Sequence, residues 1–385
     1  MAWIGSVTRS NWAILRSSRY FPAGCSHMGL FLLLVGLSLF GLVMIYSSSA
    51  VLGMQRFSDP LFFVKKQAIF LAIGWGLYFA ISQLPIEKLL DFRLSLLFLC
   101  VLGLVLVLIP GVGSAAGGAQ RWVQLGPLSF QPAELVRLLF VFYLAAGLWI
   151  KRESLSSFNR GFLPFFVATS LLMFLLILQP DFGGAMALFA ISVSMWFVGG
   201  VPLLYLGGLA LLASPALLFV LFQASYRTQR VMTFLNPWSD PQGAGFQVIQ
   251  SYLAFFEGKW TGVGLGNSQQ KLFYLPEAHT DFVFSVIGEE LGALGAMSVL
   301  SAFFLLMLFG FRIARQQQEG RLYFLGIGLS IFICLPALLN MMVTIGLLPT
   351  KGLPLPFFSA GGSSLIVSMM ALGALQALHR KRLRI

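Results

Sequence analysis

Long runs of apolar residues dominate the chain, and short polar segments with Pro, Gly or charged residues separate them. A helix that crosses a bilayer needs about 20 such residues, because the hydrocarbon core is about 30 Å thick. By that measure the pattern predicts ten membrane-spanning helices, at residues 28–47, 66–84, 93–110, 133–150, 162–179, 184–200, 203–223, 283–311, 322–347 and 362–378. Only Gly199–Pro202 separates the sixth run from the seventh, and merging these two runs would give nine spans.

The composition supports a membrane protein. Of the 385 residues, 58% are hydrophobic and 10% are charged, whereas about 25% of the residues in soluble domains are charged. The 38 Phe and 8 Trp exclude a disordered chain, and a β-barrel would show weak alternating stretches instead of continuous apolar runs. The three cysteines have no metal-binding or disulfide spacing. The sequence therefore predicts an all-α polytopic membrane protein.

The distribution of Lys and Arg predicts the orientation of the chain, because both are enriched in cytoplasmic segments. If ten spans start from a cytoplasmic N-terminus, 15 of the 25 cations lie in the cytoplasm, nine lie outside and Arg137 lies within a span. Nine spans would place the basic segment His379–Arg384 outside, so ten spans with both termini in the cytoplasm are favoured. The net charge of +12 then reflects topology and contact with membrane lipids, and no nucleic-acid partner is expected.

The expected organisation is a cytoplasmic N-terminal segment (1–27), a ten-helix transmembrane domain (28–378) and a basic cytoplasmic tail (379–385). A large extracytoplasmic loop, at about residues 224–282, joins the seventh and eighth helices, and loops this long are usually functional. It ends in Pro276-Glu-Ala-His-Thr-Asp281, which places three ionisable side chains at the mouth of the eighth span. The pattern is typical of a helix start, but a carboxylate in a low-dielectric setting also suits a general base.

Polar residues at the outer ends of other spans converge on the same face. Glu134 and Arg137 share one side of the fourth span, where they either neutralise each other or line a polar cavity. The Pro- and Gly-rich segment 348–364 is expected to line a cavity within the protein. The candidate site residues at this face are Arg121, Glu134, Arg137, Asp181, Lys271, Glu277, His279, Asp281, Lys351, Ser363 and Ser364, with Arg227 and Arg230 as further cations.

Cations beside acids suit a lipid-diphosphate substrate, because the cations can bind the diphosphate and an acid can deprotonate a hydroxyl. These residues alone do not separate a transferase from a transporter of the same lipid. Five motifs carry more information: Gly118-Ala-Gln-Arg-Trp122, Gln131-Pro-Ala-Glu134, Gln179-Pro-Asp-Phe-Gly183, the stretch Gly264–Gly292, and Leu353-Pro-Leu-Pro-Phe followed by Gly361-Gly-Ser-Ser364.

In these motifs and in its ten-span layout, the chain resembles the SEDS family (shape, elongation, division and sporulation) over about residues 28–378. Within the family, Glu277-Ala-His279, Ile287–Gly292 and Pro349–Gly352 are similar to the cell-division branch. The elongation branch usually has an Arg after that Glu and Val-Thr in place of Thr-Lys, and it stays the near alternative. The family usually has Tyr where this chain has Ala360, which could alter the cavity wall or a partner contact.

The resemblance implies a peptidoglycan glycosyltransferase that polymerises lipid II on the outer face of the cytoplasmic (inner) membrane, at the division septum. Asp281 matches the family's essential aspartate and is expected to be the general base on the acceptor hydroxyl, with inversion at the donor and undecaprenyl diphosphate as the leaving group. Glu134 and Arg137 match cavity residues of the fourth span, where the family usually has Lys. No cofactor is firmly expected; a divalent cation at Asp281, Mg²⁺ or Mn²⁺, stays open without a ligand cluster to support it.

The resemblance also implies partners. They are a class B penicillin-binding protein transpeptidase of the FtsI type and division regulators of the FtsQ, FtsL and FtsB type. Two other function classes stay open. One is a lipid II flippase or transporter, and the other is a scaffold that recruits the division transpeptidase.

Overall fold

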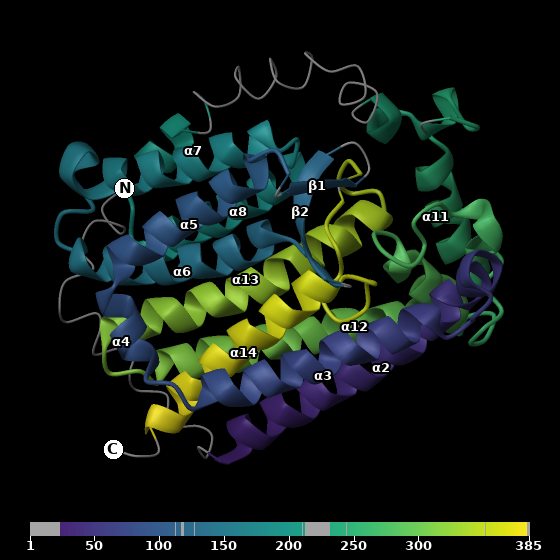
Figure 1. Ribbon diagram of the computed structural model, residues 1–385, viewed down its shortest axis with the longest axis horizontal. Helices are drawn as coiled ribbons and strands as arrows, with labels where there is room; N and C mark the ends of the chain where they lie inside the picture. Colours follow the sequence, from purple (N-terminus) through teal and green to yellow (C-terminus); the bar gives the residue numbers. More distant parts are fainter. Residues whose placement is uncertain are drawn as a thin grey trace.

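The computed structural model describes residues 24–382 except residues 112, 117–118, 127, 210, 212–231, 244 and 351. Within these residues the protein is a bundle of long helices with small elements at one end (Figure 1). By length and composition, eight described helices can cross a membrane. They are α2 (Gly24–Phe57), α3 (Phe62–Ser82), α6 (Pro132–Ile150), α7 (Leu163–Leu178) with the preceding π-helical turn η1 (Phe158–Phe162), α8 (Phe182–Gly199), α12 (Val283–Arg315), α13 (Gly320–Thr344) and α14 (Gly362–Arg382).

These helices coincide with eight of the ten predicted spans. The third predicted span corresponds to the shorter apolar helix α5 (Arg93–Leu108). Of the seventh, residues 203–209 are helical, and most of the rest lies outside the described residues. The chain is therefore a multi-pass helical membrane protein.

The sixth and seventh apolar runs do not form one continuous helix, because α8 ends at Gly199 and is followed by the C-cap residue Gly200. This glycine has φ +86°, a left-handed conformation that favours Gly. Its N–H donates to the carbonyl of Phe197, and the N–H of Val201 donates to that of Trp196, so the last carbonyls of α8 are satisfied. Pro202 follows, and the chain turns before it becomes helical again.

The small elements define the two ends of the bundle. One end carries the antiparallel strands β1 (Gly113–Ala116), β2 (Ala119–Leu125) and β3 (Leu128–Phe130), together with α11 (Phe246–Gly258), η2 (Pro237–Ser239) and η3 (Gln270–Tyr274). The opposite end carries α4 (Ile86–Asp91) and the last turn of α14 (Figure 1). We call them the sheet end and the α4 end. The prediction of an all-α chain is wrong at the sheet, because β1 and β3 are only four and three residues long and β2 lacks a regular alternation of apolar and polar residues.

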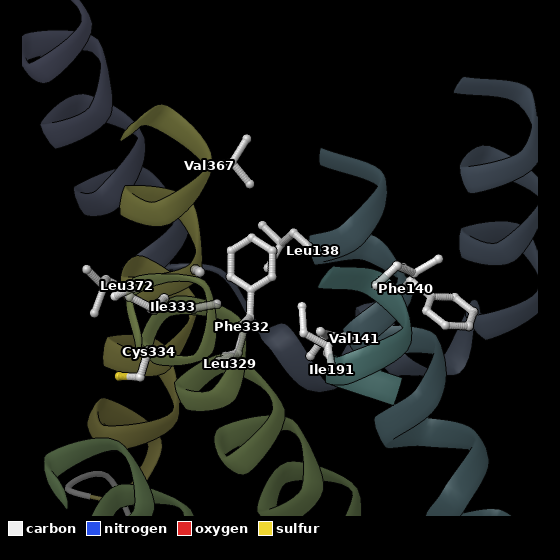
Figure 2. Close-up of a cluster of buried hydrophobic side chains, with 14 of the residues drawn as sticks. Leu138, Phe140, Val141, Ile191, Leu329, Phe332, Ile333, Cys334, Val367 and Leu372 are labelled. Carbon is white, nitrogen blue, oxygen red and sulfur yellow. The ribbon is translucent and has the colours of Figure 1, made fainter. Parts of the chain in front are cut away.

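The centre of the bundle consists of α6, α13 and α14, which are largely buried. Figure 2 shows Leu138 and Val141 of α6, Phe332 of α13 and Val367 of α14 among the buried apolar side chains between these helices. This core holds the first turns of α6 and α14 at fixed positions, and polar residues of the sheet end lie on those turns.

The long helix α12 is broken at Gly292, which has φ 66° and ψ −166°. Backbone groups of the segment Lys259–Gly264, which follows α11, replace the bonds that the break removes. The N–H groups of Val263 and Gly264 donate to the carbonyls of Glu289 and Glu290, both at 3.0 Å, and Ala293 donates to Lys259 at 2.8 Å. The first turns of α12 are therefore fastened to the large loop, and they directly follow Asp281.

Candidate active site

A polar cavity of about 360 Å³ lies at the sheet end, where the first turns of α6, α8 and α14 meet the turn before α12. Strand β2 adds two side chains to its wall, and the loop between α13 and α14 adds backbone. Its lining residues are Arg121, Trp122, Gln131, Glu134, Arg137, Asp181, Gly184, Glu277, Thr280, Asp281, Gly352, Leu353, Pro354, Ala360, Gly361, Ser363 and Ser364.

Eight of the eleven residues proposed from the sequence line this cavity, although they come from five separate segments. They are Arg121, Glu134, Arg137, Asp181, Glu277, Asp281, Ser363 and Ser364. The sequence predicted one shared face, and the structure brings these side chains to one enclosure. The chemical role of each residue stays a prediction at this point.

Glu134 and Arg137 form an ion pair in the first turns of α6, between Arg137 Nη2 and Glu134 Oε1. Both side chains are almost completely buried, with exposed fractions of 7% and 5%. A buried charge needs a partner, because moving it out of water costs on the order of several kcal/mol. The sequence left open whether these two charges neutralise each other or line a polar cavity. The structure shows both, since the residues form an ion pair and are also part of the cavity wall.

Arg121 and Asp181 form a second charged contact, across the turn between α7 and α8. Asp181 Oδ1 accepts from the N–H of Gly184 at 3.0 Å, so this carboxylate caps α8. Arg121 Nη1 lies 3.7 Å from the same oxygen, and its guanidinium also donates to the carbonyls of Gln179 and Pro180. The planar guanidinium thus ties β2 to the turn, while about a third of the Arg121 side chain stays accessible at 32% exposure.

Asp281 lies in the turn immediately before α12 and is half-buried. A Cβ placed on Gly352 would lie 3.3 Å from Asp281 Oδ2, so the carboxylate rests against the backbone of the α13–α14 loop. Thr280 Oγ1 donates to Glu277 Oε2 at 2.8 Å, which holds a second carboxylate in the same turn. This turn therefore brings two acids to the cavity wall.

The first turn of α14 closes the cavity on the side facing α6. The N–H of Gln131 donates to Ser363 Oγ at 2.9 Å, which joins the start of α6 to the start of α14. Ala360 lines the cavity at the position where the family pattern has Tyr, and its N–H donates to the carbonyl of His279 at 2.9 Å. That bond involves only the backbone, so the departure from the family pattern changes the cavity wall and leaves this contact intact.

Lys271 is not among the lining residues of this cavity; it lines a second cavity, of about 510 Å³, between α2 and the large loop. Its Nζ lies 2.9 Å from Glu290 Oε1 and donates to the carbonyl of Gly266 at 2.5 Å. Glu290 is fully buried and accepts a further bond, at 2.6 Å, from Ser47 Oγ of α2. A buried carboxylate requires a cation or donors, so Lys271 neutralises Glu290 and links α2, the large loop and α12.

His279 also points elsewhere, since its ring packs 5.1 Å from the ring of Phe63 on α3. Burial lowers the pKa of His279; the positive charge of Arg56 acts in the same direction, while Glu277 opposes both. Burial therefore favours the neutral form of His279 in the folded protein. Lys351 lies outside the described residues, as do the further predicted cations Arg227 and Arg230.

Sequence reasoning missed other residues near Asp281. Asn340 lies in α13, is 1% exposed, and donates to the carbonyls of Asp281 and Leu353. A single amide in an otherwise apolar span is a signal that could have singled it out, because a buried polar group needs partners. Trp122 and Gln131 belong to motifs noted in the sequence, and the structure places both on the cavity wall.

The described lining residues carry four carboxylates and two guanidinium groups, a formal charge of −2. Among the residues that the structure describes, no three His, Cys, Asp or Glu side chains come close enough together to hold a metal ion. Mg²⁺ is usually held by one or two carboxylates together with waters and substrate phosphates, so a divalent cation at Asp281 stays a prediction.

Comparison with known proteins gives one consistent result. Residues 28–383 match the model of the FtsW/RodA/SpoVE family, described as "Cell cycle protein". The chain is 41% identical to the probable peptidoglycan glycosyltransferase FtsW of Geobacter sulfurreducens, over 89% of this chain and 92% of that protein. It is 43% identical to the protein of the same name from Alcanivorax borkumensis, over 88% of this chain and 89% of that protein.

Solved structures of similar proteins share the fold. A chain from a structure described as "Structural coordination of polymerization and crosslinking by a peptidoglycan synthase complex" has a TM-score of 0.75 and 33% identity, and the match covers 93% of this chain and 98% of that one. The rod shape determining protein RodA of Thermus thermophilus has a TM-score of 0.66 and 29% identity, with 92% and 96% covered.

Proposed function

Since the chain belongs to the FtsW/RodA/SpoVE family of cell cycle proteins, which is the SEDS family, we propose that its sheet-end cavity is where lipid II is joined into glycan strands. The protein is a peptidoglycan glycosyltransferase of septal cell-wall synthesis. The relatives with 41–43% identity carry the FtsW name, whereas RodA is 29% identical, so the division role is favoured over elongation.

The observation that carries the proposal is the meeting of Asp281 with two guanidinium groups in one cavity. Arg121 comes from the loop between α5 and α6 and Arg137 from α6, so the fold alone brings these charges to Asp281. Sugar polymerisation from a lipid diphosphate needs a base for the attacking hydroxyl and positive charge for the leaving group. The described cavity offers both within about 360 Å³.

The reaction follows from these positions. Asp281 accepts the proton of the acceptor's 4-hydroxyl as its oxygen attacks the anomeric carbon of the donor sugar. A new C–O bond forms, the bond from that carbon to the diphosphate oxygen breaks, and undecaprenyl diphosphate leaves with the bond's electron pair. Attack from the face opposite the leaving group inverts the anomeric carbon. General base catalysis of this kind contributes about 10²- to 10⁴-fold to a rate.

Positive charge at the leaving group comes from Arg121. Its guanidinium is held by the α7–α8 turn and stays partly accessible, so it is preorganised for the negative charge that develops on the diphosphate. The Glu134–Arg137 pair keeps the wall polar and rigid beside it. A Mg²⁺ or Mn²⁺ ion shared with the diphosphate would offset the formal −2 charge of the lining, and no step is assigned to such an ion.

The proposed orientation places the sheet end outside and the α4 end in the cytoplasm, with ten spans and both termini cytoplasmic. Cations concentrate at helix ends of the α4 end, as cytoplasmic segments do. The described ones are Lys88, Arg93, Lys151, Arg152, Arg160, Arg312, Arg315, Arg321 and Arg380. The substrate would then reach the cavity from the outer leaflet of the inner membrane at the septum.

The likeness to a chain of a peptidoglycan synthase complex supports a penicillin-binding protein as partner. We extend this to a class B transpeptidase of the FtsI type. Regulators of the FtsQ, FtsL and FtsB type are the further proposed partners, because the FtsW relatives favour a division role.

The test uses the purified full chain with its transpeptidase and labelled lipid II. Wild type should form glycan polymer, and Asp281→Asn should reduce the rate by about 10²-fold or more, because the base is lost. Glu257→Gln is the matched control, since Glu257 is an exposed acid on α11 outside the cavity. If lipid II crosses the membrane without forming polymer, and does so equally well with wild type and with Asp281→Asn, the protein is a transporter and the proposal is contradicted. An inactive chain that still supports the transpeptidase would identify a scaffold.

A further inference from the structure

Three consecutive backbone carbonyls, those of His279, Thr280 and Asp281, accept hydrogen bonds from outside their own segment. The N–H of Ala360 donates to the first at 2.9 Å, Ser359 Oγ to the second at 2.6 Å, and Asn340 Nδ2 to the third at 2.8 Å. All three donors belong to α13 or to the loop between α13 and α14. The backbone that carries the proposed base is therefore held by α13 and by the α13–α14 loop, and this loop forms the opposite wall of the cavity.

Asn340 makes the most direct of these contacts. Its Nδ2 uses both hydrogens, one for Asp281 and one, at 2.7 Å, for the carbonyl of Leu353. Leu353 follows Gly352, whose backbone lies against the Asp281 carboxylate. One buried amide thus sets the distance between the segment that carries Asp281 and the wall segment that the carboxylate faces.

Two other buried polar side chains of α13, the hydroxyls of Thr344 and Ser330, donate only within their own helix among the described hydrogen bonds. Thr344, one turn further along, donates only to the carbonyls of Asn340 and Met341 in its own helix, among the hydrogen bonds of the described residues. Ser330 likewise donates to Gly326. Burying the amide of Asn340 in an apolar helix has a cost that hydrogen bonds must offset, and its two bonds both go to segments of the active site.

We propose that Asn340 is the positioning residue of Asp281. It acts through the backbone of Asp281, and the inference rests on the proposed role of Asp281 as general base. A displacement of a reacting group by about 1 Å costs roughly 10²-fold in rate. Loss of the Asn340 amide should therefore lower kcat by about that factor while KM for lipid II changes by no more than about twofold, because Asn340 does not line the cavity.

The experiment compares Asn340→Leu, Asn340→Ala and the control Thr344→Val in the full chain with its transpeptidase. Leu has about the size of Asn but no hydrogen to donate, so Asn340→Leu should lose kcat as Asn340→Ala does, although it fills the same space. Thr344→Val removes a buried hydroxyl of the same helix and should keep kcat within about threefold. Lipid II binding and the thermal midpoint are measured for each variant.

A double-mutant cycle adds a measurement that a merely structural role would not affect. In Asp281→Glu the base is already displaced by one methylene, so Asn340→Ala should cost much less there than in wild type, because the two changes share one cause. Additive effects would overturn the inference. So would Asn340 variants that keep kcat, or variants that lose lipid II binding and thermal stability together. If wild type makes no polymer, or Asp281→Asn makes it normally, the proposed function itself fails.

Discussion

The buried ion pair between Lys271 and Glu290 allows a sharp test of how the large loop is held. The two side chains are 7% and 0% exposed, with Lys271 Nζ 2.9 Å from Glu290 Oε1. At an effective dielectric constant of ~20, the attraction at this distance is about 6 kcal/mol, much of which offsets the cost of desolvation. Lys271→Met leaves Glu290 buried without its cation, and breaking a pair in this way destabilises by about 3–5 kcal/mol.

The assay is the thermal midpoint of the purified protein, measured beside kcat and KM for lipid II. For a chain of this size, about 2 °C per kcal/mol gives an expected decrease of roughly 6–10 °C in Lys271→Met. Adding Glu290→Gln should restore most of this loss, since the charge that lacked a partner is then absent and Gln still accepts from Ser47. Lys65→Met is the control, because Lys65 forms a similarly short pair with Asp59 on the surface, and the midpoint should stay unchanged.

One outcome would refute this reasoning. The sequence suggested that Lys271 binds the diphosphate, and a ligand-binding cation would behave differently from a structural one. If Lys271→Met raises KM for lipid II at an unchanged thermal midpoint, Lys271 contacts the substrate and the structural role is wrong.

Three further predictions follow from the site and its supports. Gly292→Ala should lower both the thermal midpoint and the activity, because φ 66° is unfavourable for Ala and the new Cβ would lie 2.5 Å from the backbone of Trp260. The control Gly36→Ala places its Cβ in open space on α2 and should be neutral in the same assays. Burial lowers the pKa of His279, so the folded state resists protonation of this side chain. The stability that neutral His279 contributes is therefore complete above pH about 6.5 and is lost as pH falls below that value. Thermal midpoints measured from pH 7.5 to 5 should fall more steeply in wild type than in His279→Leu. Arg121→Gln should lower kcat/KM for lipid II by roughly 10²-fold in steady-state assays, and full activity would show that Arg121 does not stabilise the leaving group.

Much of the fold was predictable because membrane thickness sets a length that apolar runs must match. The same physics placed Glu134, Asp181 and Asp281 on one face, since polar groups at span ends must avoid the hydrocarbon. The sequence could not show which charged side chains pair with one another. Lys271 and Arg121 look alike as loop cations, but only the fold shows that one faces Glu290 and the other the cavity.

Long-range contacts and backbone geometry escaped prediction for similar reasons. Asn340 binds a carbonyl 59 residues away, and no local pattern encodes that separation. The break in α12 depends on the positive φ of Gly292, and glycine is frequent throughout this chain, so no single glycine stands out. Both features become visible only when the large loop and the α13–α14 loop are placed against α12.

The way Asp281 is held suits a group that gains and loses a proton in every reaction cycle. Glu134 and Asp181 are fixed through their own carboxylates, by Arg137 and by the N–H of Gly184, and such contacts weaken when a carboxylate is protonated. The contacts from Asn340, Ser359 and Ala360 hold the backbone carbonyls of the turn, which do not titrate. These three contacts persist in both protonation states of Asp281, so the turn that carries the proposed base does not have to be rebuilt after each proton transfer.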